Sequence, residues 1–195
     1  RLLAQRRIHA TSVMVCSPRW SSDAHALKPF AQQASIGLHL DWTSAFAQAQ
    51  GHGLGLGALM GRSAVRGLSR PHVEREIGRQ LDAFESVWQA PPGHVDGHQH
   101  IHQFPVIREA LLHTLSHRYG SQAPWLRWSR VVVTQSASWS ERLKASVIDA
   151  WGAHALAQRA QACALRLRGP LLGVYDFDPT PGVFAAHMEQ WLQAS

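Results

Sequence analysis

The chain has 195 residues, of which 45% are hydrophobic, and its formal net charge is +6. This length and apolar fraction suit one folded domain with a sizeable core and exclude a disordered chain. No apolar run approaches the roughly 18–20 residues that a membrane helix needs, so we expect no membrane span. The basic residues are scattered, so we expect no nucleic-acid partner either. The two cysteines, Cys16 and Cys163, are too few for a disulfide framework and favour a reducing compartment, the cytoplasm.

Short β-branched or apolar runs alternate with longer helical patterns along the chain. The runs typical of strands are ATSVMVC, SIGLHLDW, HVDGHQH, PWLRWSRVVV and LLGVYDF, at residues 10–16, 35–42, 94–100, 124–133 and 171–177. Apolar residues at helical spacing predict helices over 73–89, 104–120 and 140–165, the last in two pieces around Gly152. This alternation predicts an α/β fold with parallel strands, in which ligands bind at the carboxyl ends of the strands.

The segment GHGLGLGALMGRSAVRGL, residues 51–68, interrupts this pattern. It has G-x-G spacing but no G-x-G-x-x-G fingerprint after a strand, so its support for a phosphate-binding role is weak. We predict a mobile loop here.

The segment HVDGHQHIH has a metal-capable side chain at every second position: His94, Asp96, His98, His100 and His102. Alternate side chains of a strand share a face, and burying five titratable groups on one face is costly without a purpose. We therefore predict metal or acid–base chemistry here. A fully extended run would separate its first and last histidines by about 26 Å, so at most two neighbours could bind one ion directly. Gly97 marks a bulge or the strand end, and a bend there would bring His98 to the edge of the sheet.

A partner for this run lies in the earlier predicted strand, where GLHL places His39 between two leucines. Taken alone, such a histidine is more typical of a core than of a metal site. A catalytic metal usually has a third protein ligand, often a carboxylate. Asp96 could be that ligand or could hydrogen-bond a ligating imidazole, and Asp41 is a second candidate. The spacing does not decide between these alternatives.

Several of these segments resemble the YdjC-like carbohydrate deacetylases, which include chitooligosaccharide deacetylase and homologues associated with hopanoid biosynthesis. The most specific segment is PGHVDGHQHIHQFPVIREAL (92–111), supported by IHATSVMVCSP (8–18), IGLHLDWT (36–43) and APWLRWSR (123–130). The resemblance implies one domain over 1–195, with a distorted, TIM-like (β/α) barrel of parallel strands. It implies one divalent metal ion, magnesium or zinc, and removal of an acetyl group from an N-acetylated sugar or oligosaccharide. It assigns the two histidine ligands to His39 and His98.

The resemblance is incomplete at both ends of the chain. The family takes its third ligand and its catalytic base from adjacent aspartates in an N-terminal D-D-F-G motif, which these 195 residues lack. A C-terminal strand ending in a C-H-P-like motif is also missing. We therefore expect a barrel that is incomplete at both ends, with exposed sheet edges that favour a homo-oligomer. We also expect weak or absent deacetylation by this chain.

The remaining side chains have expected roles in such a reaction. Asp96, His100 and His102 are the candidate catalytic residues, which would orient groups or move protons. Arg127 is a candidate for substrate contact, with a structural ion pair as its alternative. Trp42 and Trp128 could stack on a sugar ring, with core packing as the commoner fate of such side chains.

Two other functions are consistent with the residues. The first is a non-catalytic sugar- or metal-binding protein of the same fold, which the missing aspartates favour. The second is a different barrel metallohydrolase, since H-x-H on an early strand is typical of amidohydrolase-like sites. The late position of the H-x-H run, after a helix, counts against the second.

Overall fold

The centre of the molecule is a parallel β-sheet. The computed structural model describes residues 2–133, 137–172 and 182–194. In these ranges the sheet has five strands in chain order: β1 (Ala10–Val13), β2 (Ser35–Leu40), β3 (His94–Gly97), β4 (Trp125–Arg127) and β5 (Leu167–Arg168). All four neighbouring pairs are parallel. The predicted α/β class with parallel strands is confirmed. Within the described ranges β1 and β5 are the two edges, so the sheet does not close on itself.

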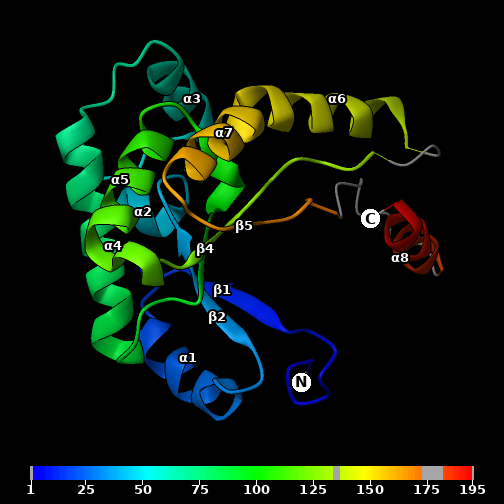
Figure 1. Cartoon of the computed structure of the whole chain (residues 1–195), viewed down its shortest axis with the longest axis horizontal. Helices are drawn as coiled ribbons and strands as arrows, with labels where there is room; N and C mark the ends of the chain where they lie inside the picture. Colours follow the sequence, from blue (N-terminus) through cyan, green and yellow to red (C-terminus); the bar gives the residue numbers. More distant parts are fainter. Residues whose placement is uncertain (1, 134–136, 173–181, 195) are drawn as a thin grey trace.

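Helices connect the strands, and Figure 1 shows α4 and α5 side by side along the sheet. The α-helices are α1 (Trp20–Leu27), α2 (Ala45–Ala49), α3 (Leu56–Ala64), α4 (Arg70–Trp88), α5 (Ile107–Tyr119), α6 (Trp139–Ile148), α7 (His154–Ala162) and α8 (Val183–Ala194). A π-helical segment, η4 (Asp149–Ala153), joins α6 to α7. The short 3-10 helices are η1 (Lys28–Phe30), η2 (His98–Gln103) and η3 (Gly120–Gln122). Strand, helix and next strand therefore alternate as the sequence predicts.

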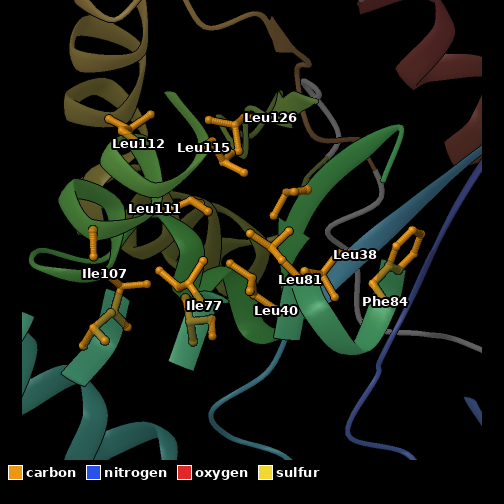
Figure 2. Packing of buried hydrophobic residues seen from close by; sticks show 14 of the residues in the cluster. Leu38, Leu40, Ile77, Leu81, Phe84, Ile107, Leu111, Leu112, Leu115 and Leu126 are labelled. Atoms are coloured by element: carbon orange, nitrogen blue, oxygen red, sulfur yellow. The ribbon is translucent and has the colours of Figure 1, made fainter. Parts of the chain in front are cut away.

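The main core lies between the sheet and the pair α4–α5, as Figure 2 shows. Each helix presents an apolar stripe at a spacing of three or four residues, and the strands add the side chains that point toward the helices. Fully buried members of this core include Leu38, Leu40, Ile77, Leu81, Phe84, Ile107, Leu111, Leu115 and Leu126. Burying each such side chain stabilises the fold by about 1.5–3 kcal/mol before entropy is counted. This packing fixes one face of the sheet against the helices and leaves its other face for polar residues.

The two predicted helices of this core are confirmed. Pro71 stands in the first turn of α4, where a missing N–H costs nothing. Gln89 adopts a left-handed conformation and ends that helix. Gly120, with a φ of 55°, follows the end of α5 as predicted.

The predicted break at Gly152 is also confirmed, because η4 separates α6 from α7 there. The φ of Gly152 is +132°, which disfavours any residue with a side chain. A Cβ atom at this position would lie 2.2 Å from the carbonyl oxygen of Gln103. Glycine therefore allows the α6–α7 connection to approach the segment that follows β3.

Three predicted elements need correction. Residues 51–68 are not simply a loop, because α3 forms within them, with Leu59 fully buried and the Ser63 hydroxyl donating to the carbonyl of Pro105 at 2.6 Å. The strand predicted over 94–100 ends at Gly97. The fifth strand is Leu167–Arg168 and not 171–177, most of which lies outside the described residues; Leu171 forms one isolated bridge with Val131.

Two expectations from composition concern the whole chain. None of the helices in the described ranges has both the length and the apolar character needed to cross a membrane. Both cysteines are free thiols; Cys16 is buried and Cys163 is exposed.

Candidate functional site

Strands β2 and β3 bring the predicted histidine and aspartate side chains together. In their parallel register, His39 is opposite Asp96 and Leu40 is opposite Gly97. Because side chains alternate along a strand, Leu38 and Leu40 enter the helix-covered core and His39 points to the other face. There the His39 Nδ1 atom lies 2.8 Å from Asp96 Oδ1. The local alternation of apolar and polar residues therefore delivers this pair to the carboxyl ends of two adjacent strands.

Ser12, from β1, completes a three-residue network with this pair. Its hydroxyl donates to Asp96 Oδ2 at 3.0 Å, and its oxygen lies 3.4 Å from His39 Nδ1. Burial by itself would raise the pKa of Asp96, but the hydrogen bonds from His39 and Ser12 and the nearby His39 charge outweigh it and lower that pKa. An ionised Asp96 accepts the His39 Nδ1–H, which leaves Nε2 as the nitrogen available to a ligand.

Sequence reasoning missed Ser12. The signal was present only indirectly, because β1 was predicted as a strand and serine is a small hydroxyl residue within it. The pairing of Ser12 with Gly37, two residues before His39 on β2, reveals its position.

His98 follows β3 directly and lies beside His39. The two rings meet edge to face, with 5.6 Å between their centroids and an interplanar angle of 69°. Burial lowers the pKa of His98, so its imidazole is neutral near pH 7 and has a lone pair for a ligand. The two predicted metal ligands are thus neighbours at the ends of adjacent strands. Within the described ranges, no set of three histidine, cysteine or acidic side chains is placed to hold a metal ion.

The two carboxylates left open by the sequence have other partners. Asp96 holds the His39 imidazole, which is the second of the two roles considered for it. Asp41 is fully buried, and its carboxylate accepts from the backbone N–H groups of Thr43 and Ser44 and from the Ser44 hydroxyl. These bonds fix the turn that begins α2. Neither carboxylate is therefore free to be a third ligand or a general base in this arrangement.

The chain turns sharply after His98, so the histidines do not share one extended face. Gln99 and His100 adopt left-handed conformations, with φ of 52° and 61°. His100 Nδ1 lies 3.1 Å from the Ser129 hydroxyl, and burial lowers the pKa of His100 to about 4. At neutral pH a neutral imidazole is a poor proton donor, so this position favours an orienting role over that of a general acid.

His102 is fully buried beneath the same turn. Its Nε2–H donates to the backbone carbonyl of Arg127 at 3.0 Å, and its Nδ1 has no hydrogen-bond partner among the described residues. Burial lowers the pKa of His102 to about 4. His102 thus ties the segment after β3 to the end of β4, a positioning role without solvent access.

His94 lies apart from the other histidines, at the start of β3. It is 3% exposed, its Nδ1 lies 2.8 Å from the Ser35 hydroxyl, and its ring stacks on Trp125 at 4.3 Å. Gly37 leaves the space for this ring, since a Cβ atom there would lie 2.4 Å from His94 Nε2. Burial lowers the pKa of His94 to about 4. The structure therefore places this histidine in the packing of the sheet.

The three candidates for substrate contact differ in their surroundings. Trp42 is 3% exposed and packs in the main core against His52, so no face of its ring is open to a sugar in this conformation. Trp128 is half-buried; its indole N–H donates to the Ala153 carbonyl at 3.1 Å, and the Arg130 guanidinium lies over its ring. Arg127 is half-buried, its charge acts on His94 and His100, and within the described ranges it forms no ion pair. Of the three, Arg127 is the one whose charge acts on His100.

The open parallel sheet and its connecting helices are consistent with a TIM-like (β/α) fold, and the two histidines with Asp96 form a polar site at its strand ends. The chain matches the model of the YdjC-like proteins over residues 1–195 and belongs to that family, which is related to the carbohydrate deacetylases.

A solved structure agrees with this fold. The chain is similar to a protein from Enterococcus faecalis described as a "putative cellobiose-phosphate cleavage protein", with 16% sequence identity and a TM-score of 0.66. The match covers 98% of this chain and 66% of that one, so the chain spans just under two thirds of the length of this structural neighbour. No curated protein matches the chain.

Proposed function

We propose that this chain carries the histidine side of a metal-dependent carbohydrate deacetylase, which removes the acetyl group from an N-acetylated amino sugar or oligosaccharide. The observation that supports this most is the contact between His39 and Asp96 beside the neutral ring of His98. A histidine held at one nitrogen by a carboxylate is the usual state of a metal-binding imidazole. Membership of the YdjC-like family supports a sugar derivative as the substrate.

The two histidines fit a divalent cation. Asp96 occupies the Nδ1 side of His39, and burial keeps His98 unprotonated, so each ring has one nitrogen with a free lone pair. Imidazole donors suit zinc, whereas magnesium prefers oxygen donors, and we propose one ion of either kind. When bound, such an ion polarises the acetyl carbonyl and lowers the pKa of water.

The residues of the chain would divide the remaining work between them. Asp96 fixes the direction of the His39 ring through its Nδ1 atom, with Ser12 holding the second carboxylate oxygen. His100 orients groups near the site, and because its ring is neutral near pH 7 it does not repel a bound cation. Arg127 supplies a cationic contact for a substrate oxygen.

A catalytic base is the element that these residues do not provide. An amide resists hydrolysis because water is a weak nucleophile and the tetrahedral oxyanion is costly, so a base that takes the proton of water matters. Asp41 and Asp96 both have other hydrogen-bond partners. We therefore expect ion binding by residues 1–195 with weak or absent turnover. This observation also favours the second candidate function, a non-catalytic sugar- or metal-binding protein of the same fold.

We also propose a cellular compartment and an oligomeric state, from the cysteines and from the edges of the sheet. The two free thiols agree with a reducing compartment such as the cytoplasm. Among the described residues β1 and β5 are the outer strands, and we propose that such sheet edges favour a homo-oligomer.

The test begins with calorimetric titration of zinc and of magnesium into the chain, beside His98→Ala and the matched control His94→Ala. We expect His98→Ala to lose this site and His94→Ala to keep it, because His94 lies apart, against Ser35 and Trp125. Equal losses in the two variants would show that His98 is not the ligand. An assay of deacetylation, which measures acetate released from N-acetylglucosamine oligomers, then distinguishes the deacetylase function from the non-catalytic binding function.

A further inference from the structure

The chain has a second histidine motif, which the proposed function does not use. His113 and His117 are four residues apart in α5, so they occupy one face of the helix, one turn apart. Both side chains are exposed, and their rings stack with 6.1 Å between centroids and an interplanar angle of 24°. Two imidazoles at this spacing on a helix can bind one ion together, as in helical zinc-binding motifs.

A carboxylate from the neighbouring helix lies at ion-pair distance from one of these rings. Glu74 of α4 places its Oε1 atom 3.2 Å from His113 Nδ1. At this ion-pair distance the carboxylate favours a proton on Nδ1, which leaves Nε2 of His113 for a ligand, and metal-binding histidines commonly have a carboxylate on this side. Thr114 and Arg118 complete a surface hollow with the two histidines and Glu74.

The positive charges around this hollow are offset by carboxylates. Arg70 donates to Glu74 Oε1 at 2.8 Å. Arg118 lies 2.7 Å from Asp82 and 2.6 Å from Glu85. Each arginine has an acidic partner, so the hollow does not have an unbalanced positive charge that would repel a cation.

We propose that His113 and His117 form a binding site for a borderline divalent transition-metal ion such as zinc, copper or nickel, with Glu74 positioning His113. Imidazole nitrogens prefer these ions to magnesium or calcium. Two direct protein ligands are fewer than the four of a structural zinc site, so we expect weaker and exchangeable binding. The inference does not rest on the proposed deacetylase function, because His39 and His98 take no part in it.

Zinc titration in a background without the other proposed site tests this directly. The chain with His98→Ala should bind one zinc ion, and the double variant with His98→Ala and His117→Ala should lose at least about tenfold in affinity. Adding Glu74→Gln to His98→Ala should weaken zinc binding by about tenfold. His25→Ala, which removes an exposed histidine from α1, is the matched control and should leave zinc binding unchanged.

The possible outcomes decide the matter. Zinc binding that is absent from the His98→Ala chain, or unchanged by the further His117→Ala substitution, would overturn the proposal. Protection of His113 and His117 from diethylpyrocarbonate by zinc, read by mass spectrometry, gives a second measurement on the unmodified sequence, and lack of protection would also overturn it. A His117→Ala chain that still binds one zinc ion would show that the site at His98 exists independently. A His117→Ala chain that binds no zinc would contradict the site at His98 and would agree with the site at His113 and His117.

Discussion

The most informative single change is Asp96→Asn, because it removes a charge while conserving size. The Asp96 carboxylate accepts from His39 at 2.8 Å and from the Ser12 hydroxyl at 3.0 Å. An asparagine amide can keep both contacts, with its oxygen toward His39 and its NH₂ toward the serine oxygen. The variant therefore isolates the effect of the negative charge on the His39 imidazole.

We expect this loss of charge to weaken zinc binding by about 10–100-fold, the usual effect of altering a group that orients a metal ligand. That factor corresponds to about 1.4–2.8 kcal/mol of binding free energy. Replacing a charge-assisted hydrogen bond by a neutral one should lower the free energy of unfolding by only about 1 kcal/mol. Binding should thus suffer more than stability.

The assay is calorimetric zinc titration near pH 7.5, in a His117→Ala background that removes the surface pair on α5. Urea unfolding of the same proteins measures stability separately. A zinc affinity equal to that of the parent chain would refute the reasoning, because the Asp96 charge would then have no influence on the ligand. A loss of affinity matched by extensive unfolding would refute the selective effect.

Three further predictions concern the surroundings of this site. Ser12→Ala should weaken zinc binding by less than Asp96→Asn, about tenfold or below, because His39 keeps its carboxylate partner; an effect larger than that of Asp96→Asn in the same titration would contradict this. Burial gives His94 a pKa of about 4 in the folded chain against about 6.5 when unfolded, so the unfolded state takes up the proton first as pH falls and stability decreases between pH 6.5 and 4. His94 should contribute about 2 kcal/mol of this loss between pH 7 and pH 5 in urea unfolding, beside similar contributions from His100 and His102, whose pKa values burial also lowers to about 4. A His94→Gln chain should therefore lose about 2 kcal/mol less than the parent chain over this range, and an unchanged pH dependence would exclude a contribution from His94. Gly37→Ala should lower the free energy of unfolding by about 1–3 kcal/mol, because the added methyl group would press on the His94 ring. Combining it with His94→Ala should remove this destabilisation, and additive losses of the two substitutions in unfolding experiments would argue against the contact.

Local sequence patterns determined much of the fold. The apolar spacing of residues 73–89 and 104–120 predicted α4 and α5, because a helical period depends only on nearby residues. Gly97 was predicted as a bulge or strand end and is the end of β3. The prediction for residues 51–68 was wrong in part, because the glycines indicated a loop and burial of Leu59 stabilises α3 there.

What the sequence determined by itself is the alternation of strands and helices, which predicts a parallel sheet, whereas the pairing of His39 with His98 was predicted only through the family resemblance. Only the tertiary structure decided which groups share the site. The register of β1, β2 and β3 brings Ser12, His39 and Asp96 together, and the left-handed turn after His98 separates histidines that an extended strand would align. Strand register depends on contacts between residues that are distant in sequence, and no local pattern encodes those contacts.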